Sequence, residues 1–160
     1  PDFPVKGILF KDITPLLNDP TLFKLAIEEM VMKYKTKGVE HVVGIESRGF
    51  IFGAPLSLRL NAGFVPVRKK GKLPAATKAV TYSLEYGEDT LEIHTDAIKP
   101  GAKVLLVDDL LATGGTARAV CDLLKSMGAQ VVGIAFLIEL TFLKGIEKLR
   151  HHNVSSIISY

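Results

Sequence analysis

The sequence lacks the features of disulfide-bonded and membrane-spanning proteins. Its 160 residues contain a single cysteine, Cys121, which cannot form an internal disulfide and indicates a reducing compartment. The longest apolar stretch, residues 131–138, is far too short to cross a bilayer and is followed by Glu139. No secretory signal opens the chain. We therefore expect a cytoplasmic protein that does not engage a membrane.

Dense basic runs and common nucleotide or metal motifs are also missing. The formal net charge is +3 at pH 7 and the basic residues are spread along the chain, so nucleic-acid binding is not indicated. Neither a Gly-Lys-[Ser/Thr] P-loop nor a Gly-x-Gly-x-x-Gly fingerprint occurs. The histidines share no spacing with cysteine or acids that would suggest a metal site: His41, His94, His151 and His152. The mild positive balance suits a pocket for phosphorylated anions.

Apolar runs of strand length alternate with helix-like segments. The runs are continuously hydrophobic, which indicates strands buried on both faces, as in a parallel sheet. The expected strands are residues 41–45, 64–67, 104–107, 131–138 and 156–159. The expected helices are roughly residues 22–37, 51–60, 116–127 and 142–150, with Gly38, Gly63 and Gly128 at three of their ends.

This alternation predicts one α/β domain over residues 1–160, with a mostly parallel sheet flanked by helices. The chain begins at Pro1 rather than Met, which leaves open whether a short N-terminal segment precedes the domain. Two segments depart from the alternation. Residues 1–17 are rich in proline and are expected to be irregular, whereas residues 70–96 form a long excursion with short extended pieces at 80–86 and 90–94. Long excursions in compact domains are often lids or binding loops.

The strongest functional signal is a buried strand that runs into two acids and a glycine-rich loop. The loop can turn several backbone N–H groups towards one anion, and the helix that follows adds its dipole. Its glycines allow the dihedral angles and the close approach, and its threonine hydroxyls can donate as well. The candidate phosphate-binding residues are Ala112, Thr113, Gly114, Gly115 and Thr116.

The two acids, Asp108 and Asp109, look unfavourable beside an anion unless a cation or hydroxyl groups lie between them. They can accept hydrogen bonds from ribose hydroxyls and help to hold a magnesium ion. The alternative is that the acids begin an ordinary turn and that the loop only caps a helix. The complete succession of strand, acid pair, loop and helix favours the phosphate site.

The segment Val104-Leu-Leu-Val-Asp-Asp-Leu-Leu-Ala-Thr-Gly-Gly-Thr116 closely resembles the phosphoribosyl pyrophosphate signature of type I phosphoribosyltransferases. Other segments resemble, in the right order, the members of that family that act on adenine. They are Phe3-Pro4, Gly7-Ile-Leu-Phe-Lys-Asp-Ile13, Glu46-Ser-Arg-Gly-Phe-Ile-Phe-Gly53, Val67-Arg-Lys-Lys-Gly-Lys-Leu-Pro74, Tyr82-Ser-Leu-Glu-Tyr-Gly87 and Glu139-Leu-Thr-Phe-Leu-Lys-Gly145.

The resemblance spans nearly the whole chain and implies an activity and a fold. The implied reaction is transfer of the 5-phosphoribosyl group from phosphoribosyl pyrophosphate (PRPP) to adenine, giving AMP and pyrophosphate in purine salvage. Mg²⁺ is implied as a cofactor that PRPP carries to the neighbourhood of Asp108 and Asp109, with no certain protein ligand of its own. A homodimer is implied too, and the implied fold adds to the sheet a small hood, from the N-terminal segment and the C-terminal region, and a flexible lid loop.

The resemblance also assigns residues to the pyrophosphate. The turn at residues 46–49 resembles the family's pyrophosphate loop, in which Ser47 and Arg48 bind and a non-proline cis peptide is expected at Glu46–Ser47. Basic residues that match positions neutralising the leaving group are Arg68, Lys69 and Lys72. The alternatives are that Arg48 is a surface residue in an ordinary turn and that the basic residues are simply solvated, which is the interpretation we prefer for Lys70.

For the base, the resemblance implies that Leu9 offers its backbone to the Watson–Crick edge and that Phe10 and Leu140 sandwich the ring. Composition alone would make Phe10 and Leu140 core residues. Lys11 stands where the family commonly has arginine, so a planar bidentate contact is lost. Either base specificity is relaxed there, or Lys11 faces solvent.

Two other functions were weighed against the enzyme. A regulator that senses PRPP would need a DNA-binding domain or a basic face. The chain has no room for a DNA-binding domain and shows no sign of a basic face. An inactive homologue would not be expected to keep Asp108, Asp109, Arg48, Arg68 and Glu85 together.

The resemblance implies that Glu85 is the catalytic acid–base residue, which reaches the purine N7 when the lid closes, and that Tyr86 helps to order the lid. Replacing Glu85 by Gln should therefore reduce turnover by orders of magnitude while PRPP binding stays mostly intact. Steady-state kinetics and a PRPP titration measure the two quantities. An equal loss of binding would indicate a folding defect, and unchanged turnover would make Glu85 an ordinary exposed hairpin residue.

Overall fold

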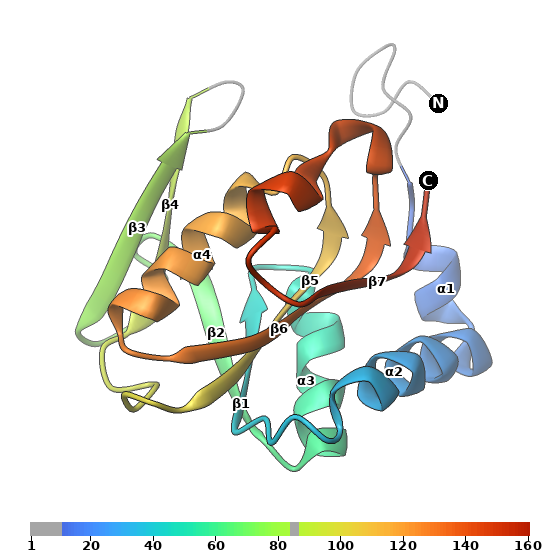
Figure 1. The fold of residues 1–160 in the computed structure, drawn as a ribbon, viewed down its shortest axis with the longest axis horizontal. Helices are drawn as coiled ribbons and strands as arrows, with labels where there is room; N and C mark the ends of the chain where they lie inside the picture. The colour runs from blue at the N-terminus through green and yellow to red at the C-terminus, as the bar shows by residue number, and fades with distance from the viewer. Residues whose placement is uncertain (1–10, 84–86) are drawn as a thin grey trace.

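The computed structural model describes residues 11–83 and 87–160, in which a seven-stranded sheet lies between two layers of helices (Figure 1). The strand order is β3-β4-β2-β1-β5-β6-β7. The five strands from β2 to β7 along that order are parallel, whereas β3 and β4 form an antiparallel hairpin that pairs with the end of β2. The strands are β1 His41–Ile45, β2 Gly63–Lys69, β3 Thr77–Ser83, β4 Glu88–His94, β5 Lys103–Leu111, β6 Gln130–Glu139 and β7 Val154–Ser159.

Helices cover both faces of the sheet. The helices are α1 Thr14–Asn18, α2 Pro20–Tyr34, α3 Gly49–Leu60 and α4 Gly115–Ser126, and two short 3-10 segments follow β6, η1 Thr141–Leu143 and η2 Gly145–Leu149. Figure 1 shows α4 on one face and α2 and α3 on the other. No helix within the described ranges is long and apolar enough to cross a membrane.

Two apolar cores explain why the strands are hydrophobic without a break. Successive side chains of a strand point to opposite faces, so each buried strand feeds both cores. Val42 and Leu105 belong to the core with α2 and α3, whereas their neighbours Val43 and Leu106 belong to the core with α4. The predicted α/β fold with a mostly parallel sheet is confirmed.

Local signals account for some of the helix ends. Asp19 caps α2, because its side chain accepts hydrogen bonds from the N–H groups of Thr21 and Leu22 at 2.8 and 3.0 Å, and Pro20 follows at the first helical position. The predicted stop at Gly63 is wrong. Asn61 adopts the left-handed conformation that ends α3, with φ 53°, and Gly63 is already the first residue of β2.

Two further expectations need correction. Within the segment expected to be irregular, residues 14–18 form α1, because Asp12 accepts a hydrogen bond from the Thr14 N–H at 2.9 Å and Pro15 suits the first turn. The helix expected at residues 142–150 is two 3-10 segments, broken where Lys144 takes a φ of 52°. The extended pieces expected at 80–86 and 90–94 fall on β3 and β4, apart from residues 84–86, which lie outside the described residues.

Gly133 on β6 offers a test of the packing between the sheet and α2. A Cβ at this position would collide with the ring of Tyr34, whose hydroxyl donates to the carbonyl of Ile134 at 3.0 Å. Gly133→Ala should therefore lower the free energy of unfolding by about 1–3 kcal/mol. Urea denaturation measures this free energy for Gly133 and for Gly133→Ala. The same comparison is made in a Tyr34→Leu background, which lacks the ring. An equal cost of Gly133→Ala in both backgrounds would contradict the collision.

Candidate active site

A cavity of about 500 Å³ opens at the carboxyl ends of β1, β2 and β5. This is the edge of an open α/β sheet at which ligands generally bind. The cavity is lined by Ile45, Glu46, Ser47, Arg48, Lys69, Lys72, Tyr82, Asp108, Asp109 and Thr116. Residues from four predicted groups therefore meet around one space: the phosphate loop (residues 112–116), the acid pair (Asp108 and Asp109), the pyrophosphate turn (residues 46–49) and the basic turn (residues 68–72).

The phosphate loop, residues 112–116, joins β5 to α4 as predicted. It encloses a smaller cavity of about 80 Å³ that is lined by every residue of the loop and shares Asp108 and Thr116 with the larger one. Gly114 has a φ of 75°, a left-handed conformation that glycine adopts without steric cost, and α4 begins directly after it. The loop and the helix N-terminus thus present backbone N–H groups to a space of the size of a phosphate.

The phosphate loop depends on a close backbone contact with Gly145, the first residue of η2. A Cβ on Gly145 would collide with the carbonyl oxygen of Ala112 and lie 2.9 Å from the nitrogen of Gly114. A Cβ on Gly114 would in turn collide with the carbonyl oxygen of Gly145. The sequence contained Gly145 in a family-like segment, but no pattern there assigned it a role.

The acid pair lies between the phosphate loop and the pyrophosphate turn. Asp109 is only 5% exposed and forms an ion pair with Arg48, and its backbone N–H donates to Oδ1 of Asp108 at 2.9 Å. Burial and the negative charge of Asp109 raise the pKa of Asp108 well above its usual value. A cation or a group of hydroxyl donors beside the pair would relieve both effects.

The pyrophosphate turn, residues 46–49, has the predicted cis peptide between Glu46 and Ser47. The turn lies directly against β5, because a Cβ on Gly49 would be 2.8 Å from the carbonyl oxygen of Val107 and 3.1 Å from Oδ1 of Asp108. Arg48 immediately precedes α3 and reaches across to Asp109. Arg48 is therefore not an isolated surface residue.

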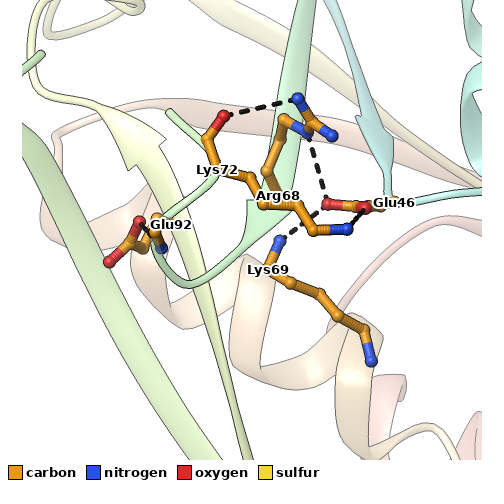
Figure 2. Close-up of polar contacts among 6 residues, drawn as sticks. Glu46, Arg68, Lys69, Lys72 and Glu92 are labelled. Atoms are coloured by element: carbon orange, nitrogen blue, oxygen red, sulfur yellow. Dashed lines mark hydrogen bonds and ion pairs between the residues drawn. The ribbon is translucent and has the colours of Figure 1, made fainter. Parts of the chain in front are cut away.

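The basic turn, residues 68–72, is held by carboxylates. Nζ of Lys72 lies 2.6 Å and Nε of Arg68 3.3 Å from the carboxylate of Glu46, whose side chain is 8% exposed (Figure 2). Nζ of Lys69 instead pairs with Asp89 of β4 at 3.2 Å, and this hydrogen bond and charge raise the pKa of Lys69. Lys69 and Lys72 line the large cavity, and Arg68 contacts Glu46, which lines it too.

Tyr82 on β3 belongs to one of the family-like segments, but the sequence assigned it no role. It lines the large cavity together with Thr116. Burial raises the pKa of its hydroxyl, against the effect of a hydrogen bond with the side chain of Thr116. The hairpin of β3 and β4 thus touches the phosphate loop, and the aromatic position in the segment 82–87 was the only sequence signal for that contact.

The residues expected around the base and on the lid are only partly described. Leu9, Phe10, Glu85 and Tyr86 lie outside the described residues. Leu140 follows β6 and packs against the core of α2 and α3.

Lys11 does not simply face solvent. Its Nζ lies 3.7 Å from the centre of the Tyr160 ring, a cation–π contact that joins the start of the described chain to the strand end of β7. Neither Lys11 nor Leu140 lines the large cavity.

Gly145→Ala should displace the phosphate loop, because the added methyl group meets backbone rather than a movable side chain. A shift of this kind is expected to weaken PRPP binding by about 10- to 100-fold. Calorimetric titration with PRPP measures the effect. Glu147→Ala, at an exposed position of the same 3-10 helix, is the matched control and should bind like the wild type. Unaltered binding by the Gly145 variant would show that the contact does not shape the loop.

Comparison with known proteins agrees with this geometry. The model of the phosphoribosyl transferase domain matches residues 16–159. The chain is 56% identical over 158 residues to the adenine phosphoribosyltransferase of Halothermothrix orenii. The match covers 99% of this chain and 93% of that relative.

Solved structures give the same result. A crystal structure of adenine phosphoribosyltransferase from Thermoanaerobacter pseudethanolicus has a TM-score of 0.96 at 52% identity and covers 100% of this chain and 93% of that one. The enzyme from Saccharomyces cerevisiae, in complex with an imino-altritol bisphosphate and adenine, has a TM-score of 0.91 at 43% identity and covers 98% and 90%. The chain therefore belongs to the phosphoribosyl transferase domain family, among the adenine phosphoribosyltransferases.

Proposed function

We propose that this chain is a pentosyltransferase that transfers the 5-phosphoribosyl group from PRPP to adenine, giving AMP and pyrophosphate. One observation carries the proposal: the phosphate loop, the acid pair, the pyrophosphate turn and the basic turn surround adjoining cavities that share Asp108 and Thr116. A phosphate group, a ribose and a diphosphate are three parts of one donor molecule, and these groups of residues suit them in that order. The adenine complex of the yeast relative supports the choice of base.

The reaction breaks the bond between the anomeric carbon and the diphosphate and forms a bond from that carbon to N9 of adenine. Positive charge builds on the ribose as the diphosphate leaves, as in glycoside hydrolysis. The phosphate loop anchors the 5′-phosphate, and the acid pair accepts hydrogen bonds from the ribose hydroxyls. Arg48, Lys69 and Lys72 stabilise the charge of the departing diphosphate. From its match to the family's motif, Glu85 would accept the proton from N7 of adenine as N9 bonds to the anomeric carbon.

The residues at the acid pair suit a magnesium ion that arrives with the donor. Asp108 and Asp109 would offer hard oxygen atoms beside an ion carried by the donor, and burial and the charge of Asp109 raise the pKa of Asp108. Within the described residues no three His, Cys, Asp or Glu side chains cluster as a metal cage. A hydrated Mg²⁺ bound largely through substrate oxygens needs no such cage. Once bound, the ion neutralises part of the diphosphate charge.

We also propose a homodimer located in the cytoplasm. Apolar side chains are exposed on the helices of one face, with Leu25 of α2 at 55% and Leu58 of α3 at 82%, which supports association through α2 and α3. The single cysteine, Cys121, is buried, and burial raises the pKa of its thiol to about 12, so it is poorly reactive and suits a reducing compartment.

The proposed function predicts release of pyrophosphate from PRPP that depends on both adenine and Mg²⁺. A coupled pyrophosphate assay measures the rate, with hypoxanthine, guanine and xanthine as competing bases. Adenine should support turnover at least about 100-fold faster than an oxopurine, because a site built for the exocyclic amine leaves polar groups unpaired with an oxo group. Turnover of an oxopurine with none for adenine would overturn the choice of base and leave the transferase reaction standing.

A further inference from the structure

Glu46 is an acid placed inside a site for an anion. Its backbone N–H donates to the carbonyl of Val67 at 2.9 Å, which fixes it beside the carboxyl end of β2. Its side chain is only 8% exposed and lines the large cavity. A buried carboxylate here repels a diphosphate and costs desolvation, so its presence calls for a compensating role.

Both carboxylate oxygens of Glu46 are engaged by the basic turn (Figure 2). Oε1 accepts from Nζ of Lys72 at 2.6 Å. Oε2 accepts from the backbone N–H of Lys69 at 2.9 Å and from Nε of Arg68 at 3.3 Å. Nη1 of Arg68 also donates to the carbonyl of Lys72 at 3.4 Å, which closes the turn on itself. One carboxylate thus draws two like-charged side chains to a common point.

The cluster remains attractive to an anion. Burial would raise the pKa of Glu46, but hydrogen bonds from Lys72, the Lys69 N–H and Arg68 outweigh it and lower the pKa to about 2. Glu46 is therefore charged at neutral pH, and Arg68 and Lys72 together exceed it by one positive charge. The carboxylate offsets the mutual repulsion of the two cations without cancelling their field.

A second acid supports the same turn in a different way. Glu92 of β4 is 8% exposed and accepts the backbone N–H of Gly71 at 2.9 Å (Figure 2). It holds the main chain of the turn, whereas Glu46 holds both the main chain and the cations. Glu92 therefore stabilises the shape of the turn, whereas Glu46 also determines where its charged side chains lie.

We propose that Glu46 is a positioning residue that gathers Arg68 and Lys72 at the place where the diphosphate of the donor binds. This inference rests on the proposed function, because it names the diphosphate as the anion. On binding, the diphosphate oxygens accept from further N–H donors of the two cations, while Glu46 keeps the hydrogen bonds that hold them in place. Cations that already converge need less ordering when the ligand arrives.

The test compares Glu46→Gln with Glu147→Gln, the same substitution at an exposed residue of η2. Glutamine keeps an oxygen for the Lys69 N–H and nearly the same volume, but it loses the charge that gathers Lys72 and Arg68. For Glu46→Gln, the KM for PRPP and the inhibition constant for pyrophosphate should rise on the order of tenfold. The KM for adenine and the inhibition constant for AMP, which has no diphosphate, should stay within about twofold. Glu147→Gln loses the same charge at an exposed position outside the basic turn and should match the wild type in all four constants.

A merely structural role for Glu46 would move the AMP and pyrophosphate constants together, and that result overturns the proposal. So does a Glu46→Gln enzyme with wild-type constants for PRPP and pyrophosphate. If Glu46→Gln fails to fold, Glu46→Asp replaces it, because aspartate keeps the charge on a shorter side chain. It should raise the same two constants, for PRPP and pyrophosphate, by a smaller factor. Calorimetric binding of pyrophosphate tests Glu46 even if the wild type shows no turnover with adenine, which would refute the proposed function alone.

Discussion

The site depends on the pairing of each cation with a carboxylate that comes from a different element. Arg48 pairs with Asp109, Arg68 and Lys72 share Glu46, and Lys69 pairs with Asp89. Cations that converge on one cavity repel one another, and the low dielectric of a half-buried site strengthens that repulsion. The carboxylates remove this obstacle before any ligand is present. These ion pairs also connect the ends of β1, β2, β4 and β5. The pairing of charges in the site therefore depends on the alignment of these strand ends, and it stabilises that alignment.

Glycine supplies the second requirement, which is that main-chain segments approach one another closely enough for their polar groups to face a small ligand. Gly49 brings the pyrophosphate turn against Val107 and Asp108, and the facing pair of Gly114 and Gly145 brings η2 against the phosphate loop. These contacts join segments that are distant in the sequence. Because they are contacts between backbones, no change of rotamer can relieve a larger residue there. The phosphate loop is thus held from the C-terminal side as well as by its own strand and helix.

The sequence predicted what depends on local pattern and on a family-like motif. Residues 41–45 were predicted as a strand and form β1 with those bounds, since a continuous apolar run between polar ends determines such a strand. The helix predicted for residues 142–150 was wrong, because the backbone of Gly145 must lie against Ala112 and Lys144 adopts a left-handed conformation before it. The acids and bases of the site were identified, but their pairing was not. Whether Arg68 meets Glu46 or Asp89 depends on strand order and register, and local periodicity carries no information on either.

Where the cations of a site are already paired with carboxylates, an incoming anion competes with those carboxylates for the cations. When an anion takes Arg48 from Asp109, that buried carboxylate loses its partner, and an unpaired buried charge is costly. An anion alone would therefore gain little from each cation that it captures. A ligand that brings both phosphate oxygens and a cation would satisfy both halves of the Arg48–Asp109 pair, with oxygens for Arg48 and the cation for Asp109. The same pairs that prearrange the site therefore limit what a free anion gains, through the carboxylates as much as through the cations.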